Sequence, residues 1–426
     1  MGETPQQAVA RLYRGHYPAL VAPLIRIMGS FELAEDIVQD AFAQALTTWE
    51  AQGVPPTPIA WLRRTARNRA IDQYRRQSSW QAKSQELAQG APENASTNFS
   101  DSVFDEDVHD DALRLIFTCC HPSLSPAAQI ALTLRTVCGF TTEEAARAML
   151  LQPATLQQRI VRAKRKIDLA KIPYTVPDLE ALPGRLGTAL QTIYLLFTEG
   201  YGATKGDALI RHELCEEAIR LARLLASLLP EQASIRAVLA LMLLHHSRRH
   251  ARTDSAGDLI TLDMQDRSTW DRDLIAEALP MVELCLVTPP VSHYAIEAAI
   301  SALHASAPVA AETDWPQIAA LYGLLLERAG ENPVIELNAA VAVAMAGQVQ
   351  EGLDRLDSLD SSNALPNYHL LPAARGDLLA RLGRWQDAQE AFASALTTVS
   401  NDVERRYLQK RSGEVSAKFE RKTKNF

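Results

Sequence analysis

The chain has 426 residues, of which 47% are hydrophobic and 22% are charged. This composition is typical of a globular protein with a sizeable core, and the length allows two to four domains at the usual ~100–200 residues each. The net charge of −8 argues against a protein that coats nucleic acid without specificity. No apolar run approaches the ~18 residues of a membrane span, and the N-terminal residues lack the apolar core of a signal peptide. We therefore expect a cytoplasmic protein that contacts no membrane.

The N-terminal residues predict helices, of which the second has an acidic face. Residues 5–28 carry apolar side chains at helical spacing and predict either one helix or two helices broken near Pro18 and Pro23. Ser30 is a suitable N-cap for the next helix, which has an apolar stripe on one side. Its other face gathers Glu32, Glu35, Asp36, Gln39 and Asp40. Such a surface repels phosphate and offers acceptors to a basic groove of another protein.

A basic helix follows, starting at Thr57-Pro58, an N-cap residue followed by proline at the first helical position. Its outer face carries Arg63, Arg64, Arg67, Arg69, Arg75 and Arg76. Trp61, Asn68 and Tyr74 are interleaved with these arginines, which suits phosphate contact together with stacking on unpaired bases. A charge run alone is often only a solvated face. The acidic and basic helices together instead predict a helical domain, residues 1–77, that binds a protein and a nucleic acid at once.

The composition changes between residues 78 and 110, where Ser, Gln, Asn and acidic residues dominate and helical periodicity is weak. At over thirty residues this segment exceeds the ~12–15 expected of an ordinary loop. We therefore expect an acidic, mobile linker between two domains.

Helical periodicity resumes over residues 111–172 and ends in a helix-turn-helix pattern. Thr141 and Glu144 form a capping box for a short helix, and a longer basic helix starts at Pro153 after a tight turn. A capped helix, a turn of a few residues and a basic helix are the signature of a DNA-reading domain.

The second helix of this pattern separates an apolar side from a polar one. The residues expected to face inward are Leu156, Ile160, Ala163 and Ile167. Residues expected to face outward include Gln157, Gln158, Val161, Arg162 and Arg165. Gln pairs with adenine, Arg with guanine, and the Val161 methyls suit a thymine methyl. Arg159 and Lys164 are more suitable as phosphate contacts.

No disulfide framework or metal site is predicted. Five cysteines are too few and too scattered for a framework, and Cys119-Cys120-His121 with Cys138 only loosely resembles a ligand set. Because Cys119 and Cys120 fall inside an apolar helix, we favour buried thiols. A second histidine group consists of His245, His246 and His250. It lacks a carboxylate–histidine pattern, so we expect no metal and no cofactor.

The remaining residues, 173–426, are rich in Ala and Leu and predict a large helical domain. Helices are expected at 184–198, 208–229, 232–250, 273–287, 293–305, 316–329, 333–346, 350–359, 368–382 and 385–398. Segments 342–359 and 378–396 align with an offset of thirty-six residues and resemble tetratricopeptide repeats, whose period is ~34. The repeat pattern is clearest over residues 331–400.

A polar cluster in this region consists of Gln265, Asp266, Arg267, Trp270 and Asp271. One interpretation is a capped helix start, with Ser268 as N-cap and Asp271 completing the box. The other is a ligand or docking site on the concave side of a helical solenoid. The pattern alone does not separate these two interpretations.

Three segments resemble one known family. Residues 34–42, 58–76 and 139–167 are similar, in that order, to regions 2.2, 2.3–2.4 and 4.2 of extracytoplasmic-function (ECF) sigma factors, a group of the sigma-70 family. The whole chain resembles the subgroup that carries a C-terminal tetratricopeptide-like extension. The resemblance implies an all-α chain: sigma region 2, a linker, a region 4 helix-turn-helix and a helical extension that controls sigma activity.

The resemblance also implies partners and residue roles. Core RNA polymerase would be bound through the clamp helices of the β′ subunit and the β flap, with Glu35, Asp36, Gln39 and Asp40 on the clamp helices. The −10 promoter element would be held by Trp61, Arg64, Arg67, Asn68, Arg75 and Arg76, with Asn68 at a flipped base. The −35 element would be read by a surface comprising Thr155, Gln157, Gln158, Arg159, Val161, Arg162 and Arg165. Entry to that helix departs from the usual family pattern, because Ala154-Thr155-Leu156 replaces Gly-Thr-Val.

The function predicted is therefore that of a sigma factor, with a protein or small-molecule regulator of the extension as a further partner. The alternative is a one-component DNA-binding regulator whose helical domain senses a ligand or a protein and which never engages polymerase. An enzyme is not expected, because the sequence has no phosphate-binding glycine loop and no nucleophile elbow.

Overall fold

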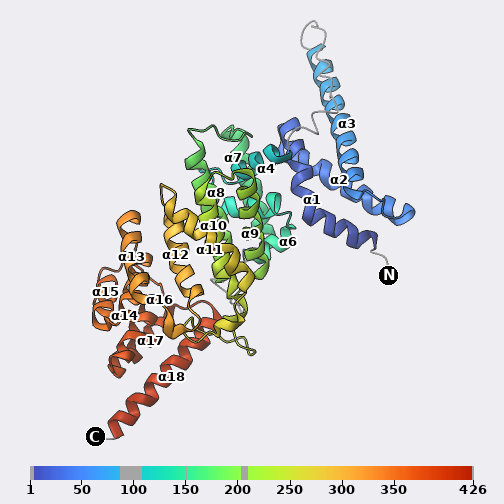
Figure 1. Cartoon of the computed structure of the whole chain (residues 1–426). Coiled ribbons are helices and arrows are strands. Elements are labelled where there is room, and N and C mark those ends of the chain that lie inside the picture. Colours follow the sequence, from blue (N-terminus) through green and yellow to red (C-terminus); the bar gives the residue numbers. More distant parts are fainter. Residues whose placement is uncertain (1–3, 87–107, 150, 203–209, 425–426) are drawn as a thin grey trace. The chain divides into compact units, whose positions relative to one another are not determined.

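The computed structural model describes the chain except for residues 1–3, 87–107, 150, 203–209 and 425–426. Its named elements are all helices, as the sequence predicts (Figure 1). Two compact units are formed, residues 1–192 and 193–426, and the boundary falls inside helix α8, beyond the predicted one at 172. None of the described helices is long and apolar enough to cross a membrane.

The first unit begins with three helices, α1 (Pro5–Met28), α2 (Phe31–Gln52) and α3 (Pro58–Glu86). α1 is one continuous helix despite Pro18 and Pro23, so the alternative of two helices is not adopted. The predicted Ser30 cap is confirmed, because its side chain accepts from the backbone N–H of Leu33 at 3.4 Å.

Helix α3 corrects the predicted domain end. It runs to Glu86, nine residues into the segment expected to be a linker, because the polar residues after Gln77 continue the helix even without an apolar stripe. The rest of that segment lies outside the described residues up to α4, which starts at Val108.

The helix-turn-helix half of this unit contains α4 (Val108–Cys119), α5 (Pro126–Leu132), a π-helical turn (Thr133–Val137), α6 (Thr142–Ala148) and α7 (Pro153–Leu169). The predicted capping box is present. The Glu144 N–H donates to the Thr141 hydroxyl at 3.1 Å, and the Glu144 carboxylate accepts from the Thr141 N–H at 2.8 Å. Gly139 adopts a φ of 71° where the chain leaves the π-helical turn, a conformation that favours glycine.

The second unit is built from successive helices. After α8 (Leu182–Tyr201) come α9 (His212–Leu228), α10 (Ala233–Ser247), α11 (Arg272–Val287), α12 (His293–Ser306) and α13 (Trp315–Ala329). They are followed by α14 (Pro333–Met345), α15 (Val349–Ser361), α16 (Leu370–Arg381), α17 (Trp385–Thr398) and α18 (Asp402–Lys424). The ten predicted helices are confirmed within a few residues. The sequence reading missed α18, whose many charged residues weaken its apolar pattern.

The segments that align at an offset of thirty-six residues form two similar helix pairs, α14 with α15 and α16 with α17 (Figure 1). Each pair turns at a glycine with positive φ, Gly347 at 104° and Gly383 at 72°. The helices approach closely, because a Cβ added to Gly352 would lie 2.5 Å from the Ala340 carbonyl oxygen. Small residues at the contact therefore explain the repeated pattern. The tetratricopeptide assignment itself remains a prediction.

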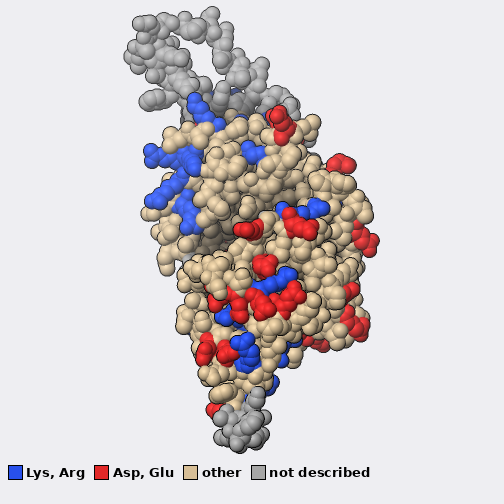
Figure 2. Space-filling model, turned by 90° about the vertical axis from the view of Figure 1, so that its left-hand side faces the viewer, with Lys and Arg blue, Asp and Glu red and all other residues tan. Residues whose placement is uncertain are grey.

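Charge is distributed in small groups. On the face drawn in Figure 2, basic side chains gather at the upper left, and acidic and basic side chains lie next to one another lower down. This agrees with the modest net charge of −8 and with local, rather than general, contact with nucleic acid.

Candidate polymerase and nucleic-acid interface

Helix α2 presents only part of its acidic face to solvent. Asp36, Gln39 and Asp40 are exposed, as a docking surface requires. Glu35 is turned inward instead and is 7% exposed. The four residues predicted to bind polymerase are therefore divided between the surface and the interior.

Glu35 is buried against the helix-turn-helix half of the same unit. Its Oε2 accepts from the Lys164 Nζ of α7 at 2.6 Å, and both side chains are about one-tenth exposed. The second carboxylate oxygen, Oε1, has no hydrogen-bond partner among the described residues. Removing two charges from water is costly unless they are paired, so this ion pair ties α2 to α7. The sequence expectation that Lys164 contacts phosphate does not hold in this arrangement.

Two further contacts join the same halves. The Arg26 side chain of α1 donates to the Asp111 carboxylate of α4 at 2.9 Å, and Asp111 is 1% exposed. Arg135, in the π-helical turn, donates to the Tyr13 hydroxyl of α1 at 2.9 Å. Burial raises the pKa of Tyr13, although Arg135 opposes that shift. The Arg135–Tyr13 hydrogen bond is therefore partly shielded from water.

A third contact involves the segment after α7. The Tyr174 hydroxyl donates to the Ala22 carbonyl oxygen of α1 at 3.1 Å. Burial is also the main reason that the pKa of Tyr174 lies far above its usual value. Four side chains thus hold the α1–α3 bundle and the helix-turn-helix half in one compact arrangement: Lys164, Arg26, Arg135 and Tyr174.

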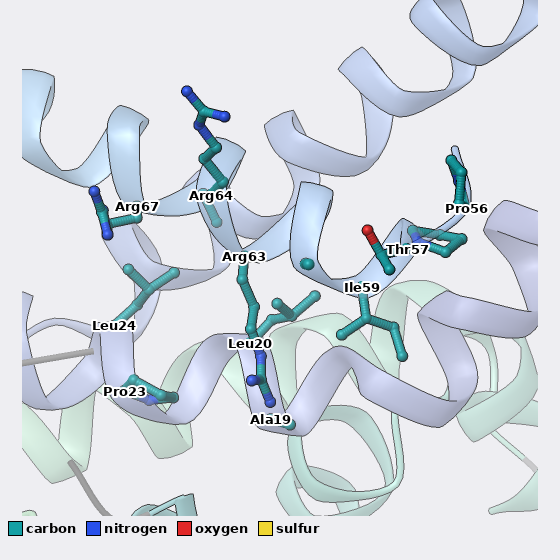
Figure 3. Close-up of a pocket in the computed structure, with 13 residues that line it drawn as sticks. Ala19, Leu20, Pro23, Leu24, Pro56, Thr57, Ile59, Arg63, Arg64 and Arg67 are labelled. Carbon is teal, nitrogen blue, oxygen red and sulfur yellow. The ribbon is translucent and has the colours of Figure 1, made fainter. Parts of the chain in front are cut away.

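Helices α1 and α3 enclose a cavity of about 910 Å³ with an apolar floor and basic side chains (Figure 3). Leu20 and Leu24 of α1 and Ile59 of α3 line the floor. Arg63 extends along α1 toward Ala19, whereas Arg64 points away from α1. Arg64 and Arg67, both predicted to hold promoter DNA, therefore lie around one site.

Asn68 belongs to a different surface of α3. It lines a groove of about 410 Å³ between α2 and α3, together with Asp40, Gln44, Arg69 and Asp72. Arg69 donates to the Asp40 carboxylate at 2.6 Å and to the Gln44 side-chain oxygen at 3.2 Å. Because successive helical residues are ~100° apart, Arg67 and Asn68 point to different sides.

The other predicted −10 residues are spread along α3. Trp61 packs edge-on against the buried Trp49 of α2, with ring centroids 5.5 Å apart, so its ring is only partly accessible. Arg75 is exposed, and the side chain of Arg76 lies outside what the structure describes. Among the five of these residues whose side chains the structure describes, it therefore forms no single cluster.

The recognition helix α7 has the predicted division of faces. Leu156, Ile160, Ala163 and Ile167 are buried. The side chains of Thr155, Gln157, Gln158, Val161, Arg162 and Arg165 are exposed, and Arg159 is half-buried. Val161 lies on this exposed face and is 46% exposed. Gln157 contacts α6 through the Thr142 hydroxyl at 3.5 Å.

The polar cluster after residue 264 has structural roles. Buried Arg267 donates to the carbonyl oxygens of His304 and Ala307, at 2.8 and 3.0 Å, and to the Thr313 hydroxyl at 2.8 Å. The expected N-cap is corrected: Asp271, not Ser268, caps α11 by accepting from Leu274 N–H at 3.2 Å.

The remaining members of that cluster also serve the local fold. Asp266 accepts from the Ser268 N–H at 2.9 Å and so caps a short 3₁₀ helix. Trp270 is buried, and Gln265 donates to the Ile260 carbonyl oxygen at 3.1 Å. The side chains of this cluster therefore make hydrogen bonds or packing contacts within the local fold.

The cysteines agree with the prediction of buried thiols. All five are free and buried. Burial raises the pKa of Cys120 to about 11 and that of Cys215 to about 12, which disfavours thiolate chemistry. The described residues contain no group of three His, Cys, Asp or Glu side chains suited to a metal ion.

Comparison with known families matches three parts of the chain. Residues 12–79 match sigma-70 region 2, and residues 114–167 match sigma-70 region 4. Residues 185–286 match a family of unknown function, DUF6596. The two sigma-70 regions coincide with the α1–α3 bundle and with the helix-turn-helix. Fold and sequence together show that the chain carries sigma-70 regions 2 and 4, which supports a role in transcription initiation.

Two relatives cover different shares of the chain. The probable ECF RNA polymerase sigma factor SigI of Mycobacterium tuberculosis is 27% identical over 168 residues, which are 39% of this chain and 57% of SigI. The uncharacterized protein R00370 of Rhizobium meliloti is 39% identical over 391 residues, covering 92% of each chain. The chain belongs to the same family as this full-length relative.

Proposed function

We propose that the chain binds core RNA polymerase and directs promoter recognition and opening. The observation that carries the proposal is the succession of sigma-70 region 2 and region 4 on one chain, the second with an outward-facing recognition helix. The catalytic step of transcription then belongs to the polymerase.

Region 2 supplies a surface for the polymerase. Asp36, Gln39 and Asp40 are exposed on one face of α2 and offer acceptors to the basic clamp helices of the β′ subunit. Region 4 engages the β flap. Its α7 places the exposed Gln157, Gln158 and Val161 against base edges of the −35 element.

Region 2 also handles the −10 element. Arg64 and Arg67 around the α1–α3 cavity neutralise phosphates of the opened strand, together with Arg75 and Arg76. Asn68 contacts an extruded base from the neighbouring groove, and Trp61 supports the strand by stacking. Because Asn68 and Arg67 face different sides of α3, the strand passes around this helix.

The Glu35–Lys164 ion pair sets a condition for binding. Glu35 reaches the polymerase and Lys164 reaches DNA phosphate only after their 2.6 Å contact breaks. We therefore assign the described arrangement to free protein, in which regions 2 and 4 occlude one another. Core polymerase supplies the binding energy that separates them.

The second unit controls sigma activity in this proposal. It follows region 4 on the same chain, through α8, and so serves as a regulatory domain of the chain's own. Its partner is a protein or a small molecule.

The test is transcription in vitro with core polymerase and a library of genomic fragments. Full-length protein should bind core and program defined start sites; binding DNA without ever engaging core would support a one-component regulator instead. Asn68→Ala should lower open-complex formation about fivefold or more, the loss of ~1–3 kcal/mol for a base contact, while core affinity is retained. Arg384→Gln, a surface change in the second unit, serves as the matched control. Equal loss of core binding and opening would refute the role of Asn68.

A further inference from the structure

A segment of the second unit lies against its C-terminal helices. Residues 252–264, called the strap, form a short turn in which Ile260 N–H donates to the Arg252 carbonyl oxygen at 2.8 Å and Gly257 has a φ of 79°. The Asp254 carboxylate accepts from the N–H groups of Ala256 and Asp258, both at 2.9 Å. The strap is therefore an ordered structure rather than a loose loop.

Side chains on both sides hold the strap in place. The Arg406 Nε of α18 donates to the Asp258 carboxylate at 2.7 Å, and its Nη2 donates to the Gly257 carbonyl oxygen at 3.3 Å. On the other side, Gln265 donates to Ile260, and buried Arg267 anchors the following turn. These contacts fix the strap across the helices beneath it.

A cavity of about 750 Å³ lies between the strap and helices α14, α16 and α18. Its apolar lining includes Leu262, Met264, Trp315, Val341, Met345 and Leu378. Met264 is 74% exposed and adds to the apolar surface that this lining offers to a ligand. The volume lies within the ~300–1,000 Å³ of small-molecule sites.

Half of the charged groups that line this cavity are held in ion pairs with one another. Asp258 pairs with Arg406, and Arg411 pairs with both Asp377 and Glu414, at 2.6 and 2.5 Å. These groups are already paired with one another, and together they carry one negative charge because Arg411 faces two acids. A ligand therefore gains little from exchanging partners with them.

Two cations at the rim of the cavity have no ion-pair partner among the described residues. Arg381 and Lys410 line the cavity and are exposed, and within the described part of the chain neither has a carboxylate oxygen within 4.0 Å. Two acids of the lining, Asp254 and Asp263, are also without an ion pair among the described residues, and the Asp254 carboxylate is taken up by the N–H groups of its own turn. Acids and cations therefore balance over the whole lining, and Arg381 and Lys410 are its two exposed cations that no carboxylate engages.

We propose that this cavity binds a small amphiphilic anion, with its apolar body on Met264, Met345 and Leu378 and its carboxylate or phosphate head on Arg381 and Lys410. The head gains charge-assisted hydrogen bonds at the rim, and the body gains burial against the floor. Asp263 accepts a hydroxyl or ammonium group where the ligand carries one.

The binding site stands on its own, and only its effect on transcription rests on the proposed sigma function. A ligand bound in the cavity covers Met264 and contacts the strap, α16 and α18 together. Binding therefore stabilises this arrangement of the second unit. The ligand is in this way the regulator of the extension.

The test compares probes that share one apolar body. Octanoate, octyl phosphate, octanol and octylammonium are titrated into full-length protein by calorimetry and by thermal shift. Either anion, or both, should bind at least about tenfold more tightly than octanol and octylammonium, and butyrate should bind more weakly than octanoate. Preference for one anion identifies the head as carboxylate or phosphate. Equal binding of all four probes, or binding of none, overturns the proposal.

Variants locate the site. Arg381→Gln with Lys410→Gln should weaken binding of the preferred anion roughly tenfold and leave octanol unchanged, since both changes are on the surface. The matched control is Arg384→Gln, an exposed cation paired with Asp387 and outside the cavity lining. Equal affinity in the double variant and the control contradicts the assignment. Transcription with and without octanoate is a separate readout, and its failure with binding intact would count against regulation alone.

Discussion

Two ion pairs in the first unit involve residues predicted to bind polymerase, and their surroundings differ. Lys164–Glu35 has side chains 10% and 9% exposed, whereas Arg69–Asp40 has side chains 38% and 63% exposed, although both N–O distances are 2.6 Å. The N–O distance alone therefore does not say which ion pair contributes more to stability. The buried pair excludes water and ties two domains together, so losing one member leaves an unpaired charge inside. The exposed pair exchanges readily with water or a partner.

The largest effect is expected at the buried pair. Lys164→Ala leaves the Glu35 carboxylate buried without a counter-ion and should lower the free energy of unfolding by about 3–5 kcal/mol. Glu35→Leu with Lys164→Met removes both charges and should cost much less. Thermal and urea unfolding of the full chain measure both. An equal loss in the single and double variants would mean that packing, not the unpaired charge, controls stability here.

An intermediate effect is expected from a neighbour of that pair. Tyr13→Phe removes the acceptor of Arg135 and should cost about 1.5–3 kcal/mol, the usual range for a hydrogen bond to a charged group. Because this bond exists only while regions 2 and 4 are in contact, core polymerase should bind about tenfold more tightly to the variant. Fluorescence anisotropy with labelled core measures the affinity. Unchanged or weaker binding would contradict the idea that this contact opposes docking.

A smaller effect is expected from Tyr174→Phe, which removes a neutral hydrogen bond to the Ala22 carbonyl oxygen. The cost should be about 0.5–1.5 kcal/mol, and core affinity should rise only several-fold. The same anisotropy measurement applies. A larger gain than that from Tyr13→Phe would reverse the ranking of the two contacts.

The smallest effect on stability is expected at the exposed pair. Asp40→Asn should change the free energy of unfolding by less than about 1 kcal/mol but should weaken core binding, because Asp40 is an exposed acceptor on α2. Glu50→Gln, also exposed on α2, is the matched control. The difference between the two variants should shrink as salt is raised. Equal core affinity in both would remove Asp40 from the docking surface.

Much of the fold follows from the sequence because its signals are local. The Ser30 cap, the Thr141–Glu144 box and Pro153 each fix a helix start within a few residues. The inward and outward faces of α7 follow from its apolar spacing. The continuation of α3 to Glu86 was missed because a polar helix has no apolar stripe to mark it.

The site was less predictable because its key contacts join distant residues. Glu35 and Lys164 are 129 positions apart, and no local pattern distinguishes a carboxylate that faces solvent from one that meets a lysine of another domain. Arg67 and Asn68 appear together in one basic stretch, although they line different surfaces. The cluster at residues 265–271 looked like a site because buried capping residues and ligand-binding residues are of the same types.

Energy transfer between a dye in region 2 and a dye in region 4 tests the account most directly. Gln52→Cys at the end of α2 and Asp168→Cys in α7 place labels on exposed positions, and the five native cysteines are buried. Free protein should show high transfer, and adding core polymerase should lower it as Glu35 and Lys164 separate. High transfer that persists in a complex competent for transcription would contradict the account.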